Sequence, residues 1–334
     1  MVECAPHLRL GGHTLDVRGP ALDIARRMEI LGALREGGNK LTGVSFVDAY
    51  GEEIYRSMER PARCDNPDLE ILRDNLCRIL HQAVAGHVEF LFGETIASIT
   101  QDDAGVEVGF ASAASRRFDL VIGADGSHSE VRRLVFGPER DFLHGMGVHT
   151  AAFGVPNFLG FDHWQVIHMN GDNIGGMYLA ADKDSNASMC LSFISEPPLD
   201  CDHRDIAAQK RLVAERFAGA GWEFPRILAH MHAAPDFYFE STNQIRMERW
   251  SRGRVALVGD AGYSISPATG QGTTVAMVGA YVLAGELAVH ASALVEGVAS
   301  YEAALRGYVE RKQDFALDDD AAPLVLRNYR DLLR

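Results

Sequence analysis

The sequence predicts a mixed α/β fold with two parts, a parallel-sheet domain and a second domain built on an antiparallel sheet. Two short apolar runs, 118–123 and 254–258, are each followed closely by aspartate beside glycine, and such runs are typical of buried parallel strands. Between them, over 142–252, the pattern changes to longer strand-like segments with a polar turn at 182–186, which favours an antiparallel sheet. The length of 334 residues also favours two interleaved domains over one.

The expected elements before residue 118 are helices and short strands. A helix begins at Pro20 and runs towards Arg35, because its apolar residues fall on one face at helical spacing. A second helix is expected where Asn66 can serve as the cap and Pro67 as the first helical residue, with a leucine stripe behind them. The other expected elements are a hairpin at 44–47 and 53–55 and strands over 87–92, 95–101 and 106–111.

The elements expected after residue 118 follow the two-part pattern. The buried strand 118–123 leads into a helix over 129–134. The middle layer is expected to contain strands over 164–170, 173–180, 188–195 and 236–241 and a helix over 204–218. The buried strand 254–258 then leads into a helix rich in small residues, 270–289, and a charged helical segment, 300–334.

The composition excludes several classes of protein. A net charge of −14 argues against a nucleic-acid-binding surface, which needs a basic patch. The five cysteines are widely spaced and form no Cys-x-x-Cys pair, so no disulfide framework is indicated and a cytoplasmic location is expected. The histidines do not pair with carboxylates at metal-ligand spacing, so no metal site is expected. The first residues show no basic region followed by an apolar stretch, so no signal peptide is expected. Glu286 and His290 interrupt the most apolar stretch, so no membrane span is expected.

The strongest functional signal is a strand that ends in Gly259 and Asp260, followed by a glycine-rich turn. A carboxylate at the carboxyl end of a buried parallel strand can accept hydrogen bonds from the hydroxyls of a sugar or a sugar alcohol. The turn Gly270-Gln271-Gly272 then opens a helix, whose backbone N–H groups and positive dipole end can stabilise an electron-rich ring. The alternative is a plain strand-to-helix connection, with glycines for tight packing.

A second signal, Asp125-Gly126, also follows a buried strand and precedes a helix. Gly126 allows the backbone to approach a ligand closely. Alone the pair is a common turn, but together with Gly259-Asp260 it becomes specific.

These motifs resemble those of the FAD-dependent monooxygenases of the para-hydroxybenzoate hydroxylase type, which include the tetracycline-inactivating enzymes. The resemblance runs from Val2 to about Val309. It implies that Asp260, after Gly259, holds the ribityl chain of FAD, and that Asp125 and Gly126 contact FAD and NADPH. The residues that it places against the isoalloxazine ring are Pro267, Gly270, Gln271 and Gly272. It further implies that Arg73 contacts FAD and that Arg18 lines the flavin side of the fold.

The family also begins with a strand, a Gly-x-Gly-x-x-Gly turn, a helix and a second strand that ends in an acidic residue. Glu3 is similar to that acidic residue, which binds the adenosine ribose, but the Gly-x-Gly-x-x-Gly turn is absent from the sequence. We therefore expect an N-terminally truncated domain, lacking on the order of 30 residues that would bind the pyrophosphate and supply a central strand.

The resemblance implies a domain order and a reaction. It assigns residues 1–141 and 253–298 to an FAD-binding domain, 142–252 to a substrate-binding domain and 299–334 to a C-terminal helical segment. It implies hydroxylation of an aromatic or polyketide-like molecule with FAD, NAD(P)H and O2, and no side chain is assigned as catalytic because the cofactor carries the chemistry. Two alternatives stay open: a flavin-free remnant that serves as a binding module, and a flavin-dependent reductase of the same superfamily.

Overall fold

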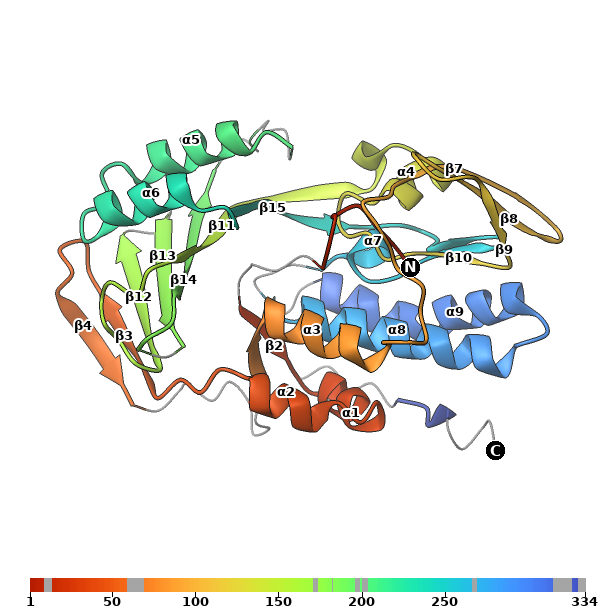
Figure 1. Ribbon diagram of the computed structural model, residues 1–334, viewed down its shortest axis with the longest axis horizontal. Helices are drawn as coiled ribbons and strands as arrows, with labels where there is room; N and C mark the ends of the chain where they lie inside the picture. The colour runs from red at the N-terminus through yellow and green to blue at the C-terminus, as the bar shows by residue number, and fades with distance from the viewer. Residues whose placement is uncertain are drawn as a thin grey trace.

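A seven-stranded sheet forms one half of the molecule (Figure 1). The computed structural model describes residues 1–8, 14–58, 69–170, 174–181, 183–195, 199, 204–265, 269–314 and 326–329. In spatial order the strands are β15 (Tyr238–Ile245), β11 (Leu143–Val155), β14 (Ala187–Ile194), β13 (Ile174–Ala180), β12 (Trp164–Asn170), β3 (Gly43–Val47) and β4 (Glu53–Ser57). Neighbours are antiparallel except β12 and β3, which run parallel.

Two helices, α5 (Ile206–Phe217) and α6 (Phe224–Ala233), cover one face of this sheet. Alternate side chains of the central strands pack against them, and Tyr178, Met189 and Phe193 are completely or almost completely buried there. The Asp205 carboxylate accepts a hydrogen bond from the Ala208 N–H and so caps α5.

The opposite side of the sheet carries the other alternate residues and is called the open face below. One row of register partners crosses it in the order Tyr55, Phe46, Ile167, Met177, Cys190, Ala152 and Tyr238. Apart from the buried Ala152, these side chains keep some contact with solvent. This row therefore leaves room for a ligand, whereas Val44 and Leu179 of the same face are buried.

Smaller sheets and most of the helices form the other half. The strands are β10 (Val121–Gly123), β17 (Val255–Leu257) and β16 (Ser251–Arg252) in one sheet, β7 (Ile96–Asp102), β8 (Gly105–Phe110) and β9 (Arg116–Phe118) in a second, β1 (Val2–Glu3) with β6 (Leu91–Phe92), and β2 (Thr14–Val17) with β5 (Leu69–Leu72). The helices are α1 (Pro20–Arg27), α2 (Leu31–Gly37), α3 (Arg73–Ala83), α4 (Glu130–Val135), α7 (Asp260–Tyr263), α8 (Gly272–Val289) and α9 (Leu294–Gln313), with a 3-10 turn over Glu139–Asp141. The predicted mixed fold, with parallel and antiparallel sheets, is confirmed.

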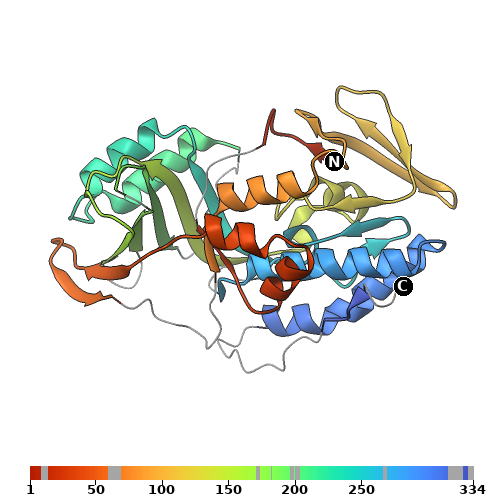
Figure 2. The same ribbon diagram turned by 60° about the horizontal axis from the view of Figure 1, so that its bottom comes forward.

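Helix α8 is the central helix of this half. It contacts α1 on one side and α9 on another (Figure 2). By length and composition it is the one helix among the described residues that could cross a membrane. Its residues Val275, Val278 and Val282 are buried against the core around β17, which is the environment of a core helix in a folded domain.

The structure corrects two predicted helices. The helix expected over 20–35 is two helices, because Glu29 adopts a positive φ of 64° and the Ile30 N–H bonds the carbonyl of Ala25, which ends α1 in a Schellman turn. The helix expected from Asn66 begins only at Arg73. Residues 59–68 lie outside the described part, and Leu69–Leu72 forms β5, because this segment pairs with β2.

The structure also differs from the expected strands and domain ranges. Phe118 belongs to β9, so the buried strand expected over 118–123 is shorter and starts at Val121. The predicted hairpin at 44–55 is present as β3 and β4, but β3 pairs with β12. By its hydrogen bonds this hairpin belongs to the seven-stranded sheet, although it falls within the range 1–141 predicted for the FAD-binding domain. The rest of the domain division stays a prediction.

Candidate functional site

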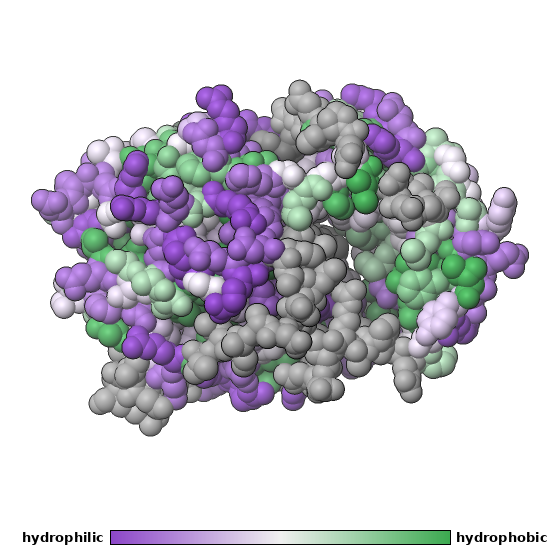
Figure 3. All heavy atoms as spheres, turned by 180° about the vertical axis from the view of Figure 1, so that it is seen from behind, coloured by the Kyte–Doolittle hydropathy of each residue, from purple (hydrophilic) through white to green (hydrophobic). Residues whose placement is uncertain are grey.

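The two aspartate motifs lie side by side in the structure. Strand β10 pairs in parallel with β17, with Val121 opposite Val255 and Gly123 opposite Leu257. The loops that follow them, which hold Asp125 and Asp260, therefore leave the same edge of the sheet. Seen from behind, the surface of the molecule is hollowed between its two halves (Figure 3).

Gly259 and Asp260 form the turn between β17 and α7. Gly259 has φ 64° and ψ −143°, a conformation that is almost restricted to glycine, and a Cβ there would lie 3.3 Å from the Cβ of Ala276. The Asp260 side chain is exposed to solvent but densely surrounded by protein, so it lines a concave wall. These protein surroundings, and then the charge of Glu240, raise the pKa of Asp260 to about 6. Hydrogen-bond donors such as ligand hydroxyls would stabilise this carboxylate.

The Asp125 carboxylate faces its own helix. It accepts hydrogen bonds from Ser129 Oγ at 2.5 Å and from the Val131 N–H at 3.0 Å, and so fixes the start of α4. Gly126 has φ 80°, and a Cβ at this position would have no neighbouring atom within 4 Å. In this motif the side chain of Asp125 orders the loop, and the open space lies beside Gly126.

Arg132 joins the two motif loops and is not among the predicted residues. Its fully buried guanidinium donates to the carbonyl of Ala261 at 2.8 Å, to the carbonyl of Ser127 at 2.5 Å and to Glu139 at 3.2 Å. Its position in the sequence carries no signal beyond an arginine in a short helix. The structure shows that it fixes the distance between the two loops.

Replacing Arg132 by methionine is expected to lower the free energy of unfolding by about 3 kcal/mol, since two buried carbonyls lose their donors. Urea unfolding of the two proteins would measure the difference. Arg133→Met is the matched control, because the Arg133 side chain is 54% exposed and pairs only locally with Glu130. Equal stability of the two variants would contradict the role given to Arg132.

The glycine-rich turn before α8 lies against Arg18. Gly270 has φ 62°, and a Cβ there would lie 2.9 Å from Asp16 Oδ2 and 3.3 Å from Arg18 Nη1. Arg18 is held by Asp16 at 2.6 Å. Gln271 is the N-cap residue and Gly272 the first residue of α8, where a Cβ would meet no atom within 4 Å. The predicted Arg18, Gly270, Gln271 and Gly272 are thus brought together, whereas Pro267 lies outside the described residues.

Glu3 and Arg73 occupy a neighbouring region. Glu3 ends β1 and accepts a hydrogen bond from the Ala5 N–H at 2.8 Å, while Arg73 is the first residue of α3. Burial raises the pKa of Cys77, the charge of Arg73 lowers it and the charge of Glu3 raises it, which places both charged groups near this thiol. Burial raises the pKa of Tyr238 on β15, and the charge of Arg73 lowers it. Arg73 is therefore close enough to Cys77 of its own helix and to Tyr238 of β15 to affect the pKa of each.

Two residues of β15, Tyr238 and Glu240, lie next to the loop of Asp125, and neither was predicted. The Tyr238 hydroxyl donates to Glu240, and Ser127 Oγ lies 3.3 Å from Glu240 Oε1. Nothing in the sequence of this strand signals that Glu240 will contact a distant loop. The contact between Glu240 and Ser127 forms because β15 extends from the sheet towards the loops that follow β10 and β17.

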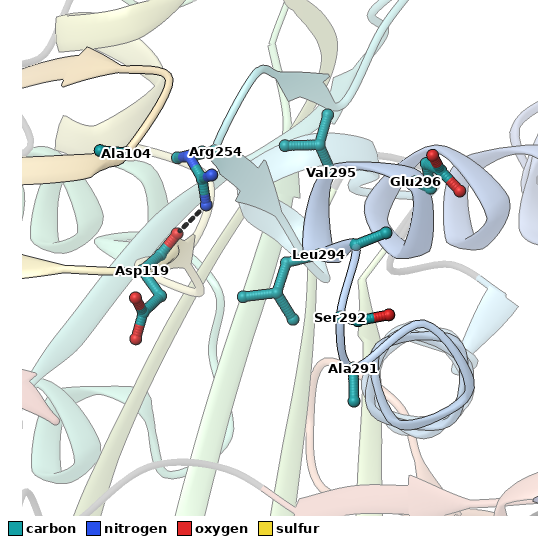
Figure 4. A pocket seen from close by; sticks show the side chains of 9 residues that line it. Ala104, Asp119, Arg254, Ala291, Ser292, Leu294, Val295 and Glu296 are labelled. Atoms are coloured by element: carbon teal, nitrogen blue, oxygen red, sulfur yellow. Dashed lines mark hydrogen bonds between the residues drawn. The ribbon is translucent and has the colours of Figure 1, made fainter.

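A surface cavity of about 380 Å³ lies elsewhere (Figure 4). It is bordered by Ala104, Asp119, Arg254 and the loop between α8 and α9. Arg254 donates to the carbonyls of Asp119 at 3.0 Å and Asp103 at 2.6 Å. Because Asp119 and Arg254 precede β10 and β17, this cavity is at the opposite end of these strands from the aspartate loops and is not part of the site.

The residues at the aspartate loops fit an FAD molecule. They combine the acceptor carboxylate of Asp260, a helix N-terminus with open space at Gly272, and the positive charges of Arg18 and Arg73. Among the residues that the structure describes, no group of three His, Cys, Asp or Glu side chains could hold a metal ion. The site is therefore suited to an organic cofactor with hydroxyls and a ring.

Comparison with known proteins agrees with this geometry. The family model described as FAD binding domain matches residues 24–316. An uncharacterized protein of Mycobacterium tuberculosis is 48% identical over 338 residues, which cover 100% of this chain and 90% of the relative. A flavin-dependent monooxygenase of Legionella longbeachae is 36% identical over 95% of this chain and 81% of its own length.

A solved structure is similar over almost the same span. The crystal structure of tetracycline destructase Tet(51) is 37% identical and superposes with a TM-score of 0.86, over 94% of this chain and 81% of its own. The chain belongs to the FAD-binding family of flavin-dependent monooxygenases, of the aromatic-hydroxylase type.

Proposed function

We propose that this monooxygenase uses NAD(P)H and O2 to hydroxylate an aromatic or polyketide-like small molecule. The observation that supports this most directly is the open face of the seven-stranded sheet, which lies on the side of the sheet that α5 and α6 leave uncovered. The similarity to a tetracycline destructase supports a polycyclic substrate. We further propose a cytoplasmic location, since Cys77 and Cys190 are free thiols.

The residues that would hold FAD are those of the aspartate loops and the start of α8. Asp260 would accept hydrogen bonds from hydroxyls of the ribityl chain, and the N-terminus of α8 at Gly272 would stabilise negative charge on the ring. Bound FAD supplies two-electron chemistry with NAD(P)H and dioxygen. Arg18, held by Asp16, would keep a positive charge beside the ring.

The open face would bind and orient the substrate. It combines apolar side chains, Phe46, Ile167 and Met177, with the polar groups of Gln165 and Ser192. Gln165 Nε2 lies 2.7 Å from Met177 Sδ, and Ser192 Oγ lies 3.1 Å from Thr150 Oγ1, so these side chains are already positioned. A surface of this kind suits a flat, mainly apolar molecule with a few polar substituents.

The test is an assay of the FAD-loaded chain with a panel of aromatic and polycyclic compounds. We expect NAD(P)H oxidation that depends on O2 and a product that has gained one oxygen atom from O2. Oxidation of NAD(P)H with a reduced organic product and no oxygen incorporation would contradict hydroxylation and favour a reductase.

Bulk added to the open face is expected to impair substrate binding. Ile167→Trp places a larger ring next to Phe46 and Met177, and we expect kcat/KM to fall about tenfold while FAD binding stays within twofold. Steady-state kinetics with a substrate from the panel would measure the effect. Ile206→Trp is the matched control, because Ile206 is 46% exposed at the start of α5, on the opposite side of the sheet from the open face. The same loss in both variants would contradict the assignment.

A further inference from the structure

Strand β15 brings two side chains of the open face close to the aspartate loops. Phe239 points to the helix-covered side, where its ring is parallel to that of His149 at 6.1 Å. Because side chains alternate along a strand, Tyr238 and Glu240 point to the open face, opposite Ala152 and Thr150 of β11. The direction of Glu240 is therefore fixed by the packing of its neighbour.

The Glu240 carboxylate is held from two sides. Tyr238 donates its hydroxyl to one carboxylate oxygen, and Ser127 Oγ lies 3.3 Å from the other. Ser127 directly follows Gly126, where the backbone borders open space. An ionised carboxylate can accept about four hydrogen bonds, so these two donors leave capacity for a ligand hydroxyl.

Glu240 is also near the loop of Asp260. Ser127, which contacts Glu240, is joined through Arg132 to the carbonyl of Ala261, the residue after Asp260, and the negative charge of Glu240 contributes to the raised pKa of Asp260. Like charges in a partly enclosed site repel each other unless donors are supplied. The other groups near Asp260 are Ser264 and Tyr263 on its own turn, Tyr238 of β15 and Arg73 of α3.

We propose that Glu240 is a second hydroxyl-accepting residue of the FAD site, which shares with Asp260 the hydroxyls of the ribityl chain. Tyr238 and Ser127 are positioning residues, because they orient the carboxylate. The inference rests on FAD binding and is independent of the substrate. A substrate hydroxyl has the same chemistry, so the experiment must separate the two sources.

The arrangement predicts that FAD affinity depends on pH. A hydroxyl donor favours the ionised form of Asp260, so FAD should bind more tightly as the pH rises through about 6, where Asp260 ionises in the free protein. Removing the charge of Glu240 should let Asp260 ionise at lower pH. The midpoint of the pH dependence therefore reports the coupling of the two carboxylates.

The experiment measures the Kd of FAD by flavin fluorescence, without substrate, between pH 5 and pH 8. The proteins are the wild type, Glu240→Gln and Glu240→Asp. In Glu240→Gln we expect an affinity about tenfold weaker at pH 8 and a midpoint shifted to lower pH. Glu240→Asp keeps the charge, so we expect its midpoint to stay near that of the wild type, although its shorter side chain weakens binding. A purely structural role for Glu240 would not separate these two variants by their midpoints.

Thermal unfolding of the FAD-free proteins controls for folding, and glutamine should fold because its amide oxygen can accept from Tyr238 and Ser127. An FAD affinity within twofold of the wild type and an unchanged midpoint in Glu240→Gln would overturn the proposal and leave substrate as the source of the hydroxyl. FAD-loaded protein that hydroxylates nothing would contradict the proposed function only. A wild-type chain that binds no FAD at any pH would overturn both.

Discussion

Replacing Gly259 by alanine is expected to lower the free energy of unfolding by about 2 kcal/mol and to abolish stable FAD binding. The backbone at φ 64° and ψ −143° is strained for any residue with a Cβ, at a cost of about 1–3 kcal/mol. The added methyl group would also lie 3.3 Å from the Cβ of Ala276 on α8. Because Asp260 is the next residue, any shift that relieves this contact moves the carboxylate that faces the cofactor.

Gly32→Ala is the matched control for Gly259→Ala. Gly32 lies in α2, outside the proposed site, and has no positive φ; a Cβ there meets no protein atom within 4 Å, and alanine is favoured over glycine in a helix. We expect its stability to stay within about 0.5 kcal/mol of the wild type or to rise slightly. Denaturant unfolding without FAD and equilibrium dialysis with FAD separate the two effects. Equal stability of the two variants would show that the turn at Gly259 is not strained.

Replacing Asp260 by asparagine is expected to stabilise the FAD-free protein and to weaken FAD binding at least tenfold. The raised pKa of Asp260 means that the folded chain binds a proton more tightly than the unfolded chain. This contribution to stability is therefore present below about pH 4 and is lost as the pH rises through about 6. At pH 8 the wild type carries the full penalty of a charged carboxylate, and asparagine removes it.

The size of this effect is limited by the contact of Asp260 with solvent. A rise of the pKa from its ordinary value of 3.8 to about 6 corresponds to about 3 kcal/mol without screening, and we expect ~1 kcal/mol after screening. Urea unfolding of the wild type and Asp260→Asn at pH 5 and pH 8 measures it, and the difference should be larger at pH 8. A variant that is less stable than the wild type at pH 8 would contradict the charge penalty, and one that binds FAD as tightly would contradict a cofactor role for Asp260.

The sequence predicts the site where local chemistry determines it. The strands before Asp125 and Asp260 are short apolar runs, and their parallel pairing follows from their burial. The turn at Gly270-Gln271-Gly272 opens α8 within two residues of the expected start. For these strands and for this turn, the residues that predict the element are the same residues that form it.

The features that the sequence did not predict depend mostly on contacts between residues that are far apart in the sequence. The Leu69–Leu72 segment has a helical stripe but becomes a strand because Thr14–Val17 pairs with it. The first helix ends at Arg27, and Glu29 takes the left-handed position of the following turn, which is usually glycine, so no residue signals the end of the helix. Arg132 and Glu240 are ordinary charged residues in the sequence, and only the folded chain places them between the two aspartate loops.

The central claim, that this chain is a flavin enzyme, is tested most directly by the visible absorbance of the purified 334-residue protein after incubation with FAD and removal of the excess. We predict a flavin spectrum that corresponds to one FAD per chain, with a clear loss in Asp260→Asn. A colourless protein, or flavin bound equally well by Asp260→Asn, would contradict the assignment of the site.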